Sequence, residues 1–333
     1  MQKKLRLLFF FFLCALSLKA QDCSNPVLTH TILTDNIRAT IGRGGGIWRQ
    51  PYTTSPQLDP GVEVYPFFAG GLWLGGLDEE GNLKLAASTY GDFSEEFDYY
   101  PGPVNTQGQT NPTLCENMEH FWPITQTDIE LFLIDFEDGN LDQFHTNIMR
   151  WPARGNPFFQ DIFGFVLPVQ DLAPFVDQNG DGFYNPLQGD YPAMKGDEAV
   201  WWVFNDLGGE HRESFGEPIG AEVQVMAYTF QNQSNNISKT SFYDLKIINR
   251  SDEPLDSFYT SLFFDFDLGC YTDDYMGCIP EENLAFVYNV DAVDGSTGCS
   301  CENGVNSYCE EIPLFGVKII NSPYNDQGEK MGM

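Results

Sequence analysis

Hydrophobic and polar positions along this 333-residue chain alternate in short runs, which is the pattern of β-strands. Three runs rich in Val, Ile, Tyr, Phe and Thr are the clearest, at residues 222–231, 241–249 and 258–266. A polar Asn/Ser stretch joins the first two runs, and Ser-Asp-Glu-Pro joins the last two. This spacing predicts three consecutive antiparallel strands that form a meander within a β-sandwich.

Signals for helices are few and local. Thr127 and Glu130 form a capping box at the start of an apolar run that includes Ile129, and this predicts one helix. A second short helix is expected just before Trp151. Because the chain contains 32 Gly and 20 Pro, long helices are not expected. The predicted fold class is therefore mostly β, an antiparallel β-sandwich-like arrangement with short helices.

A stretch rich in Pro, Gly, Asn and Asp, residues 171–198, divides the predicted elements into two groups. We expect an N-terminal β-rich region with short helices over residues 21–170 and a C-terminal antiparallel β region over residues 199–333. The connector between these regions is the predicted domain boundary.

The first 20 residues have the composition of a secretory signal peptide. Lys3, Lys4 and Arg6 precede an apolar run over residues 7–18, and Ala20 is a small residue at the expected cleavage point. This run is shorter than the roughly 20 residues that a membrane-spanning helix needs, and no transmembrane segment is predicted. We therefore expect an exported protein, either secreted or on the cell surface.

The charge balance excludes one class of partner. Lys and Arg total 17 against 48 Asp and Glu, which gives a formal net charge of -31. Binding of nucleic acid needs clustered Lys and Arg, so nucleic acid is not an expected partner. Carboxylates that a fold brings together repel one another unless a cation neutralises them. The composition therefore directs attention to bound cations.

Cysteine usage agrees with export. Removal of the signal peptide leaves seven cysteines, and disulfides are the default in an oxidising compartment. The expected pairings are Cys270–Cys278, Cys299 or Cys301 with Cys309, and Cys23–Cys115. Because seven is odd, one thiol is free or pairs outside the chain. Zinc is not favoured, since the single Cys-Ser-Cys spacing has no histidine near it.

The connector contains the strongest candidate for metal binding. Residues 177–185 read D-x-N-x-D-G-x-x-N, and Gly182 permits the sharp turn that brings oxygen donors together. Pro186 and Gly189 argue against a helix after the loop, so the pattern predicts a calcium-loop connector and not an EF-hand. A turn without metal is the alternative. The predicted Ca²⁺ ligands supply side-chain oxygens or, at one position, a backbone carbonyl, and they are Asp177, Asn179, Asp181, Phe183, Asn185 and Asp190.

A second acidic cluster follows the last of the three predicted strands. Alternation places Asp265 and Asp267 on one face, and the expected Cys270–Cys278 loop returns Asp273 and Asp274 toward them. Four carboxylates this close repel one another without a cation. We therefore expect a second cation site here, with a solvated loop at a sheet edge as the alternative.

Several sequence blocks resemble one family in their order and spacing. They are LWLGGL at 72–77, LAASTY at 85–90, YPGP at 100–103, LAPFVDQNGDGFYNP at 172–186, GDYP at 189–192, GD at 196–197, WWVFND at 201–206 and DFDLGCYTDDYMGC at 265–278. Together they resemble uncharacterised exported surface proteins of bacteria that use the type IX secretion system. The resemblance implies placement on the cell surface and specifies no reaction.

Two features depart from that family. Its members usually continue into a C-terminal β-rich sorting domain, whereas this sequence ends at Met333 without one. We therefore expect a fragment or a truncated form. The cysteine-rich stretch at 299–309 is also unlike the family.

Motifs of common enzyme classes do not occur in the sequence. It contains no H-E-x-x-H, no G-x-S-x-G and no phosphate-binding P-loop. The tryptophans could form a sugar-binding platform, but Trp201 and Trp202 lie in a strand-like run where core packing is expected. The chain is interpreted as a calcium-stabilised structural or binding module of the adhesion type, with cell-surface glycans or proteins as partners. The alternative is an extracellular hydrolase that acts on glycans through paired carboxylates such as Asp265 with Asp267 or Asp274.

Overall fold

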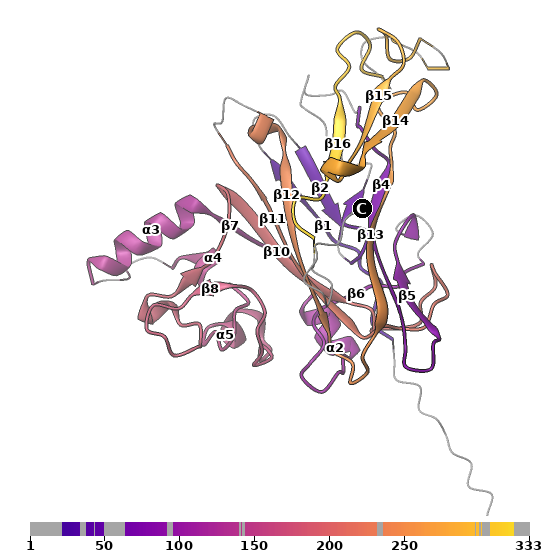
Figure 1. Ribbon diagram of the computed structural model, residues 1–333. Coiled ribbons are helices and arrows are strands. Elements are labelled where there is room, and N and C mark those ends of the chain that lie inside the picture. Colours follow the sequence, from indigo (N-terminus) through magenta and orange to yellow (C-terminus); the bar gives the residue numbers. More distant parts are fainter. Residues whose placement is uncertain are drawn as a thin grey trace, which may run out of the picture.

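The computed structural model describes residues 22–33, 38–42, 44–49, 64–91, 96–139, 141, 144–231, 236–296, 298–299, 301 and 307–322. Two antiparallel sheets form a sandwich, with short helices and loops on one side and a small third sheet at one end (Figure 1). This confirms the predicted mostly β class. The predicted signal peptide lies outside the described residues. Within them, no helix combines the length and the apolar character that a membrane crossing requires.

The first sheet has six strands, which are β1 (Thr29–Leu33), β2 (Arg38–Gly42), β3 (Trp48–Arg49), β4 (Ala69–Leu77), β5 (Leu83–Ala87) and β13 (Asp256–Asp265). They follow the order β1-β2-β3-β4-β13, and β5 is added beside β4. The glycine-rich β4 therefore pairs with β13 along one edge and with β3 and β5 along the other.

The second sheet has five strands, which are β6 (Tyr100–Pro101), β7 (Trp122–Thr125), β10 (Glu198–Asn205), β11 (Ala221–Thr229) and β12 (Ser241–Asn249). β11 lies between β12 and β10. The other edge of β10 pairs with β7 near its start and with β6 near its end.

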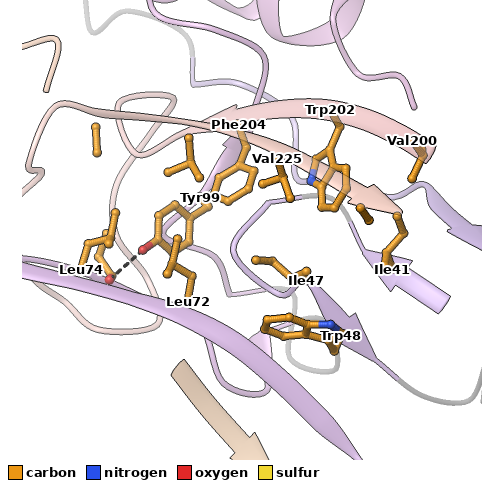
Figure 2. Close-up of a cluster of buried hydrophobic side chains, with 14 of the residues drawn as sticks. Ile41, Ile47, Trp48, Leu72, Leu74, Tyr99, Val200, Trp202, Phe204 and Val225 are labelled. Carbon is orange, nitrogen blue, oxygen red and sulfur yellow. Dashed lines mark hydrogen bonds between the residues drawn. The ribbon is translucent and has the colours of Figure 1, made fainter. Parts of the chain in front are cut away.

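Apolar side chains from the facing sides of the two sheets form the main hydrophobic core (Figure 2). Alternation along β10 places Trp202 and Phe204 in this core, where they meet Leu72 of β4. Tyr99 is buried among them, and its hydroxyl donates a hydrogen bond to the Ala86 carbonyl at 2.9 Å. Each fully buried side chain of this size contributes about 1.5–3 kcal/mol through removal from water.

A second hydrophobic core covers the outward face of the second sheet. Trp201 points to the side opposite Trp202, and it packs with Phe132, Ile148 and Phe159 of the helical layer. Both tryptophans therefore lie in cores, as the sequence predicts. The α-helices with fully described bounds are α2 (Pro112–Asn117), α3 (Gln126–Glu137), α4 (Thr146–Met149) and α5 (Phe159–Phe163).

Smaller elements complete the described fold. The third sheet has the order β14-β15-β16 and consists of β14 (Asp274–Ile279), β15 (Leu284–Asn289) and β16 (Phe315–Lys318). A two-stranded hairpin is formed by β8 (Phe175–Val176) and β9 (Tyr191–Pro192). Three short 3-10 turns are η1 (Pro186–Gln188), η2 (Asn236–Lys239) and η3 (Pro280–Glu282).

The predicted meander is wrong in its last step. β11 and β12 pair as neighbours, but β13 pairs with β4 in the first sheet instead of with β12. The reason is that β13 has its own apolar face, and Leu262 and Phe264 pack into the core between the sheets. A strand with alternating apolar residues can bury its apolar face in the same sheet as the preceding strand or in the sheet on the other side of the core. The alternation alone does not distinguish these two arrangements.

The connector at 171–198 does not separate the sheets. β4 pairs with β13, and β6 and β7 pair with β10, so each sheet contains strands from both sides of the connector. The connector itself supplies the β8–β9 hairpin and η1, and it ends at the first residue of β10.

Both predicted helices are present, but the capping box of α3 lies two residues earlier than predicted. Thr125 Oγ1 accepts the Asp128 N–H at 3.1 Å, and Asp128 Oδ2 accepts the Thr125 N–H at 2.9 Å. Thr125 also ends β7, so the chain turns into the helix as soon as the strand stops. α4 lies just before Trp151, as expected.

The cysteine predictions are partly confirmed. Cys23–Cys115 and Cys301–Cys309 are bonded. The predicted Cys270–Cys278 bond is wrong, because Cys270 pairs with Cys299 and Cys278 is free and exposed. The physical reason is that residues 274–279 extend as strand β14 instead of folding back, which takes the second cysteine away from the first.

Candidate functional site

The first predicted metal site forms the tip of the β8–β9 hairpin. Phe175 pairs with Pro192 and Val176 with Tyr191, so residues 177–190 form the loop between the two strands. Phe175 and Tyr191 also pack against the second core. The loop therefore grows out of the layer that covers the second sheet.

The start of the loop curls around the carboxylate of Asp177. Its Oδ1 accepts the Gly180 N–H at 2.7 Å, and its Oδ2 accepts the Gly182 N–H at 2.8 Å. Both glycines have positive φ, +75° and +81°, which side chains with a Cβ rarely adopt. The Asp-Gly pattern in the sequence thus serves to wrap the backbone around this carboxylate.

Two further predicted ligands lie on the exposed side of the same curl. Asn179 Oδ1 accepts the Asp181 N–H at 2.9 Å, and Asp181 Oδ1 accepts the Phe183 N–H at 2.8 Å. The Asn179 side-chain amide also donates to Asp181 Oδ2 at 2.9 Å. These bonds fix the side-chain oxygens in place while both residues remain exposed to solvent.

Asp190 and Asn185 have a different role in the loop. Asp190 is fully buried, and its two oxygens accept the N–H groups of Gln178 and Asn185, each at 2.8 Å. Asn185 Oδ1 accepts the Leu187 N–H at 3.1 Å and so caps η1. Asp190 therefore links the start of the loop to its end through hydrogen bonds.

The loop is held firmly against the helical layer. The Tyr184 hydroxyl donates to the Ile148 carbonyl at 2.8 Å. A Cβ on Gly189 would come within 2.9 Å of the Phe136 ring, so the backbone approaches α3 closely. The exposed Phe183 ring lies 5.2 Å from the Arg154 guanidinium.

The second predicted site begins at the end of β13. The Tyr90 hydroxyl donates to Asp265 Oδ2 at 2.8 Å. Burial raises the pKa of Asp267 to about 6, and the negative charge of Asp265 adds to this effect. The structure thus brings these two carboxylates together, as the alternation predicts.

Asp274 is the most unusual carboxylate of this group. Its Oδ2 accepts the Leu268 N–H at 2.7 Å, whereas its Oδ1 is buried without a hydrogen-bond partner. The pKa of Asp274 is raised to about 7, mainly by burial and in part by the negative charges of Asp294, Asp273 and Asp267. A buried carboxylate oxygen without a donor is a rare feature and fits a position where a cation binds.

Asp294 belongs to the same cluster, and the sequence analysis missed it. It is fully buried, and its oxygens accept the N–H groups of Cys270 and Tyr308. The Cys270–Cys299 disulfide brings the segment with Asp294 next to Asp273. The predicted Cys270–Cys278 pairing gave no reason to place Asp294 near Asp273. A Cys270–Cys299 pairing would have done so, because Cys299 follows Asp294 by five residues.

Ligand atoms converge more tightly at this second cluster than in the hairpin loop. Among the described residues, Cys270, Asp273 and Asp294 are the group of three whose ligand atoms all lie within 4.8 Å of one another. The Cys270 sulfur is bonded to Cys299 and is not a thiolate ligand. The group therefore reduces to two carboxylates with Asp274 beside them.

A buried histidine network offers no open catalytic base. His211 lies 3.9 Å from Asp98 and 3.8 Å from Asp206. Its Nδ1 is 2.7 Å from the Leu85 carbonyl oxygen and its Nε2 is 2.8 Å from the Asp206 carbonyl oxygen. Both ring nitrogens are thus engaged with the backbone, and His211 acts as a cross-link.

No protein-family model matches the chain, and comparisons with curated proteins and with solved structures also give no match. The resemblance to surface proteins of the type IX secretion system stays a prediction. The function is therefore inferred from the residues and contacts described above.

Proposed function

We propose that the chain is an exported, calcium-stabilised structural or binding module that acts at the cell surface or outside the cell. Three disulfides among the described cysteines support an oxidising compartment. The signal-peptide pattern of residues 1–20 and the resemblance to type IX surface proteins point the same way. The net charge of -31 makes cation binding favourable.

The hairpin loop carries the calcium part of the proposal. Its backbone N–H groups hold the oxygens of Asp177, Asn179 and Asp181 in one tight curl. Asp177 and Asp181 would supply charged ligands, Asn179 a neutral oxygen and Phe183 its carbonyl. A set of oxygen donors with mixed charge suits calcium, which accepts six to eight ligands in flexible geometry, better than magnesium.

The acidic cluster at the end of β13 supports a second cation. The unpartnered Oδ1 of Asp274 is the observation that favours it, because every other described oxygen of Asp274 and Asp294 accepts a backbone N–H. Asp273 and Asp267 lie close enough to raise the pKa of Asp274. A bound cation would remove the repulsion among these carboxylates and supply the missing partner.

Thermal unfolding of the mature, disulfide-intact protein tests the calcium proposal. A ligand that binds only the folded state at a hundredfold excess over its Kd stabilises that state by about 2.7 kcal/mol. Chelator should therefore lower the Tm, and added calcium should restore it more fully than magnesium. Asp181→Ala should remove most of this response, whereas Glu137→Ala, an exposed carboxylate on neighbouring α3, should retain it.

Two outcomes would contradict this account of the loop. One is an identical Tm for the wild type in chelator and in millimolar calcium. The other is a calcium response that survives Asp181→Ala but is lost with Asp274→Asn, which would place the stabilising ion at the β13 cluster alone.

A glycan hydrolase is the second candidate, and one observation favours it. The pKa of Asp267 is raised to about 6 beside Asp265, and glycosidases pair a carboxylic acid that keeps its proton with an ionised carboxylate. Asp267→Asn separates the two candidates. Turnover of a glycan that this variant abolishes at unchanged Tm would support the hydrolase, and absence of turnover in the wild type would support the module.

A further inference from the structure

The outward face of the first sheet presents an unusual row of side chains. On this face Trp73, Gly75 and Leu77 of β4 lie between β13 and β5. Gly75 pairs with Tyr259 on one side, and Leu77 pairs with Leu83 on the other. Figure 1 shows β4, β5 and β13 on the side of the sandwich away from α3, α4 and α5. This face therefore receives no cover from the helical layer.

A groove of about 290 Å³ lies in this face, just below the volumes typical of small-ligand sites. Its lining comes from the three neighbouring strands and consists of Gly75, Gly76, Leu77, Leu83, Ser257 and Tyr259. A register shift in β13 between Asp256 and Tyr259 borders it. Bulges of this kind often redirect a side chain beside a functional site.

A comparison of two glycines of β4 indicates that the fold does not require glycine at the groove. A Cβ on Gly71 would lie 2.1 Å from the Ser88 carbonyl oxygen, so the fold requires glycine there. A Cβ on Gly75 would meet only Leu85 and Lys84, at 3.5 and 3.6 Å, which is ordinary contact. Glycine weakens a strand interior and often marks the close approach of a ligand. Because the fold does not require glycine at position 75, we attribute Gly75 to the close approach of a ligand.

Aromatic rings continue the groove along the sheet. Trp73 stacks on Phe263 with ring centroids 5.9 Å apart and an interplanar angle of 4°. Tyr90 packs edge-on against Phe263 at 5.4 Å, and Tyr259 is 73% exposed. Tyr259 and Phe263 are four residues apart on one strand, a span of roughly 13 Å. An extended ligand would therefore contact more than one ring.

Hydrogen bonds to Glu213 hold one of these rings, that of Tyr90, in place. Glu213 Oε1 accepts the N–H groups of Thr89, Tyr90 and Gly91 at 2.6, 2.8 and 3.1 Å. The backbone of the turn that carries Tyr90 is therefore fixed, and the Tyr90 hydroxyl donates to Asp265. The Tyr90 part of the aromatic surface is therefore preorganised, which lowers the entropic cost of binding there.

We propose that this face binds a neutral oligosaccharide or polysaccharide chain, with Trp73 and Tyr259 as stacking surfaces and the groove over Gly75 as a sugar subsite. The C–H faces of pyranose rings stack on exposed aromatic rings, while Ser257 in the lining and the exposed Ser261 opposite Trp73 offer hydroxyl groups as hydrogen-bond partners. The net charge of -31 repels polyanions and therefore favours a neutral glycan over an anionic one. This inference rests on the binding role in the proposed function and names its ligand class.

Affinity gel electrophoresis of the mature protein tests the site, with laminarin, galactomannan, xyloglucan and mannan as neutral probes and polygalacturonate as the anionic probe. At least one neutral polysaccharide should retard the wild type. Trp73→Ala and Tyr259→Ala should each weaken retardation about tenfold or more, as expected for aromatic anchors. Gly75→Leu should weaken it by filling the groove. Tyr275→Ala, an exposed tyrosine on β14, is the matched control and should bind like the wild type.

The Tm of each variant shows that a loss of binding is not a loss of fold. The proposal is overturned if no neutral polysaccharide retards the wild type, if only polygalacturonate does, or if the three variants bind unchanged. It is also overturned if sedimentation shows a dimer that Tyr259→Ala dissociates, since a second copy would then cover the face. Calcium response is measured on the same samples. A Tm that responds to calcium, without retardation by polysaccharide, refutes the glycan site alone. Retardation by polysaccharide, without a Tm response to calcium, refutes the calcium proposal alone.

Discussion

The two sheets of the sandwich differ in what lies on their outward faces. Outward side chains of the second sheet, such as Trp201, are buried beneath the helical layer. Outward side chains of the first sheet include Trp73, Leu83 and Tyr259, with exposed fractions of 38%, 58% and 73%. Both faces therefore carry apolar side chains, but among the described residues the helical layer covers those of the second sheet and leaves these three side chains of the first sheet open.

This difference separates residues that build the fold from residues that serve binding. Apolar side chains on a covered face contribute to stability because folding removes them from water. Apolar side chains on an open face contribute little to stability, and a contiguous patch of them marks an interaction site. The helical layer also positions the hairpin loop, so the covered face carries the proposed calcium site and the open face the proposed glycan site.

The largest expected effect is on the covered face. Trp201→Ala should lower the free energy of unfolding by about 3–5 kcal/mol, because it leaves a large cavity between β10 and the helices. Urea unfolding followed by far-UV circular dichroism measures this loss. A loss below about 1 kcal/mol would show that the helical layer does not pack on the sheet, and the contrast between the faces would disappear.

Substitutions of the two outward-facing glycines of β4 form a matched pair, and their expected effects on stability are of intermediate size. Gly71→Ala should destabilise the protein by about 1–3 kcal/mol, because the new Cβ meets the Ser88 carbonyl. Gly75→Ala should raise stability by about 0.5 kcal/mol, since alanine restricts the unfolded chain and meets only ordinary contacts. Equal effects of both substitutions in urea unfolding would argue that Gly75 is as structurally required as Gly71.

An effect of pH on stability is also expected at the end of β13. The pKa values of Asp267 and Asp274 are raised in the fold, to about 6 and about 7. Groups with raised pKa favour the folded state below their unfolded pKa of 3.8, and this contribution is lost as the pH rises through the folded values. Stability in chelator should therefore fall between about pH 4 and pH 7.

Asp274→Asn and calcium provide the controls for this pH dependence. The substitution removes one titrating group, so the fall in stability should be shallower than in the wild type. Calcium should counteract the fall at pH 7, where a bound cation favours the ionised carboxylates. An equally steep fall in the variant would show that other groups cause it.

The sequence predicted elements better than their arrangement. The alternation at 241–249 matches β12, because a pattern of period two is a local property. The partner of β13 was not predicted, because pairing with β4 depends on a strand far away in the sequence. The same limit applies to Cys270, whose partner Cys299 is nearby only after β14 and β15 have formed.

The candidate sites show the same division between local and distant contacts. The Asp177–Gly182 curl follows from Asp, Asn and Gly within six positions, and the structure contains it. The fastening role of Asp190 and the place of Asp294 depend on burial, which the pattern does not encode. The open face depends on the absence of cover over Trp73 and Gly75, and only the assembled described fold reveals it.

Measurement of stability and polysaccharide retardation on the same preparation of Tyr259→Ala tests the central claim most directly. Tyr259 is 73% exposed, so its truncation should change the free energy of unfolding by no more than about 0.5 kcal/mol. The account predicts unchanged stability together with loss of retardation by the neutral polysaccharide that binds the wild type. Unchanged retardation, or a loss of stability comparable to that of Trp201→Ala, would contradict the assignment of the open face to binding.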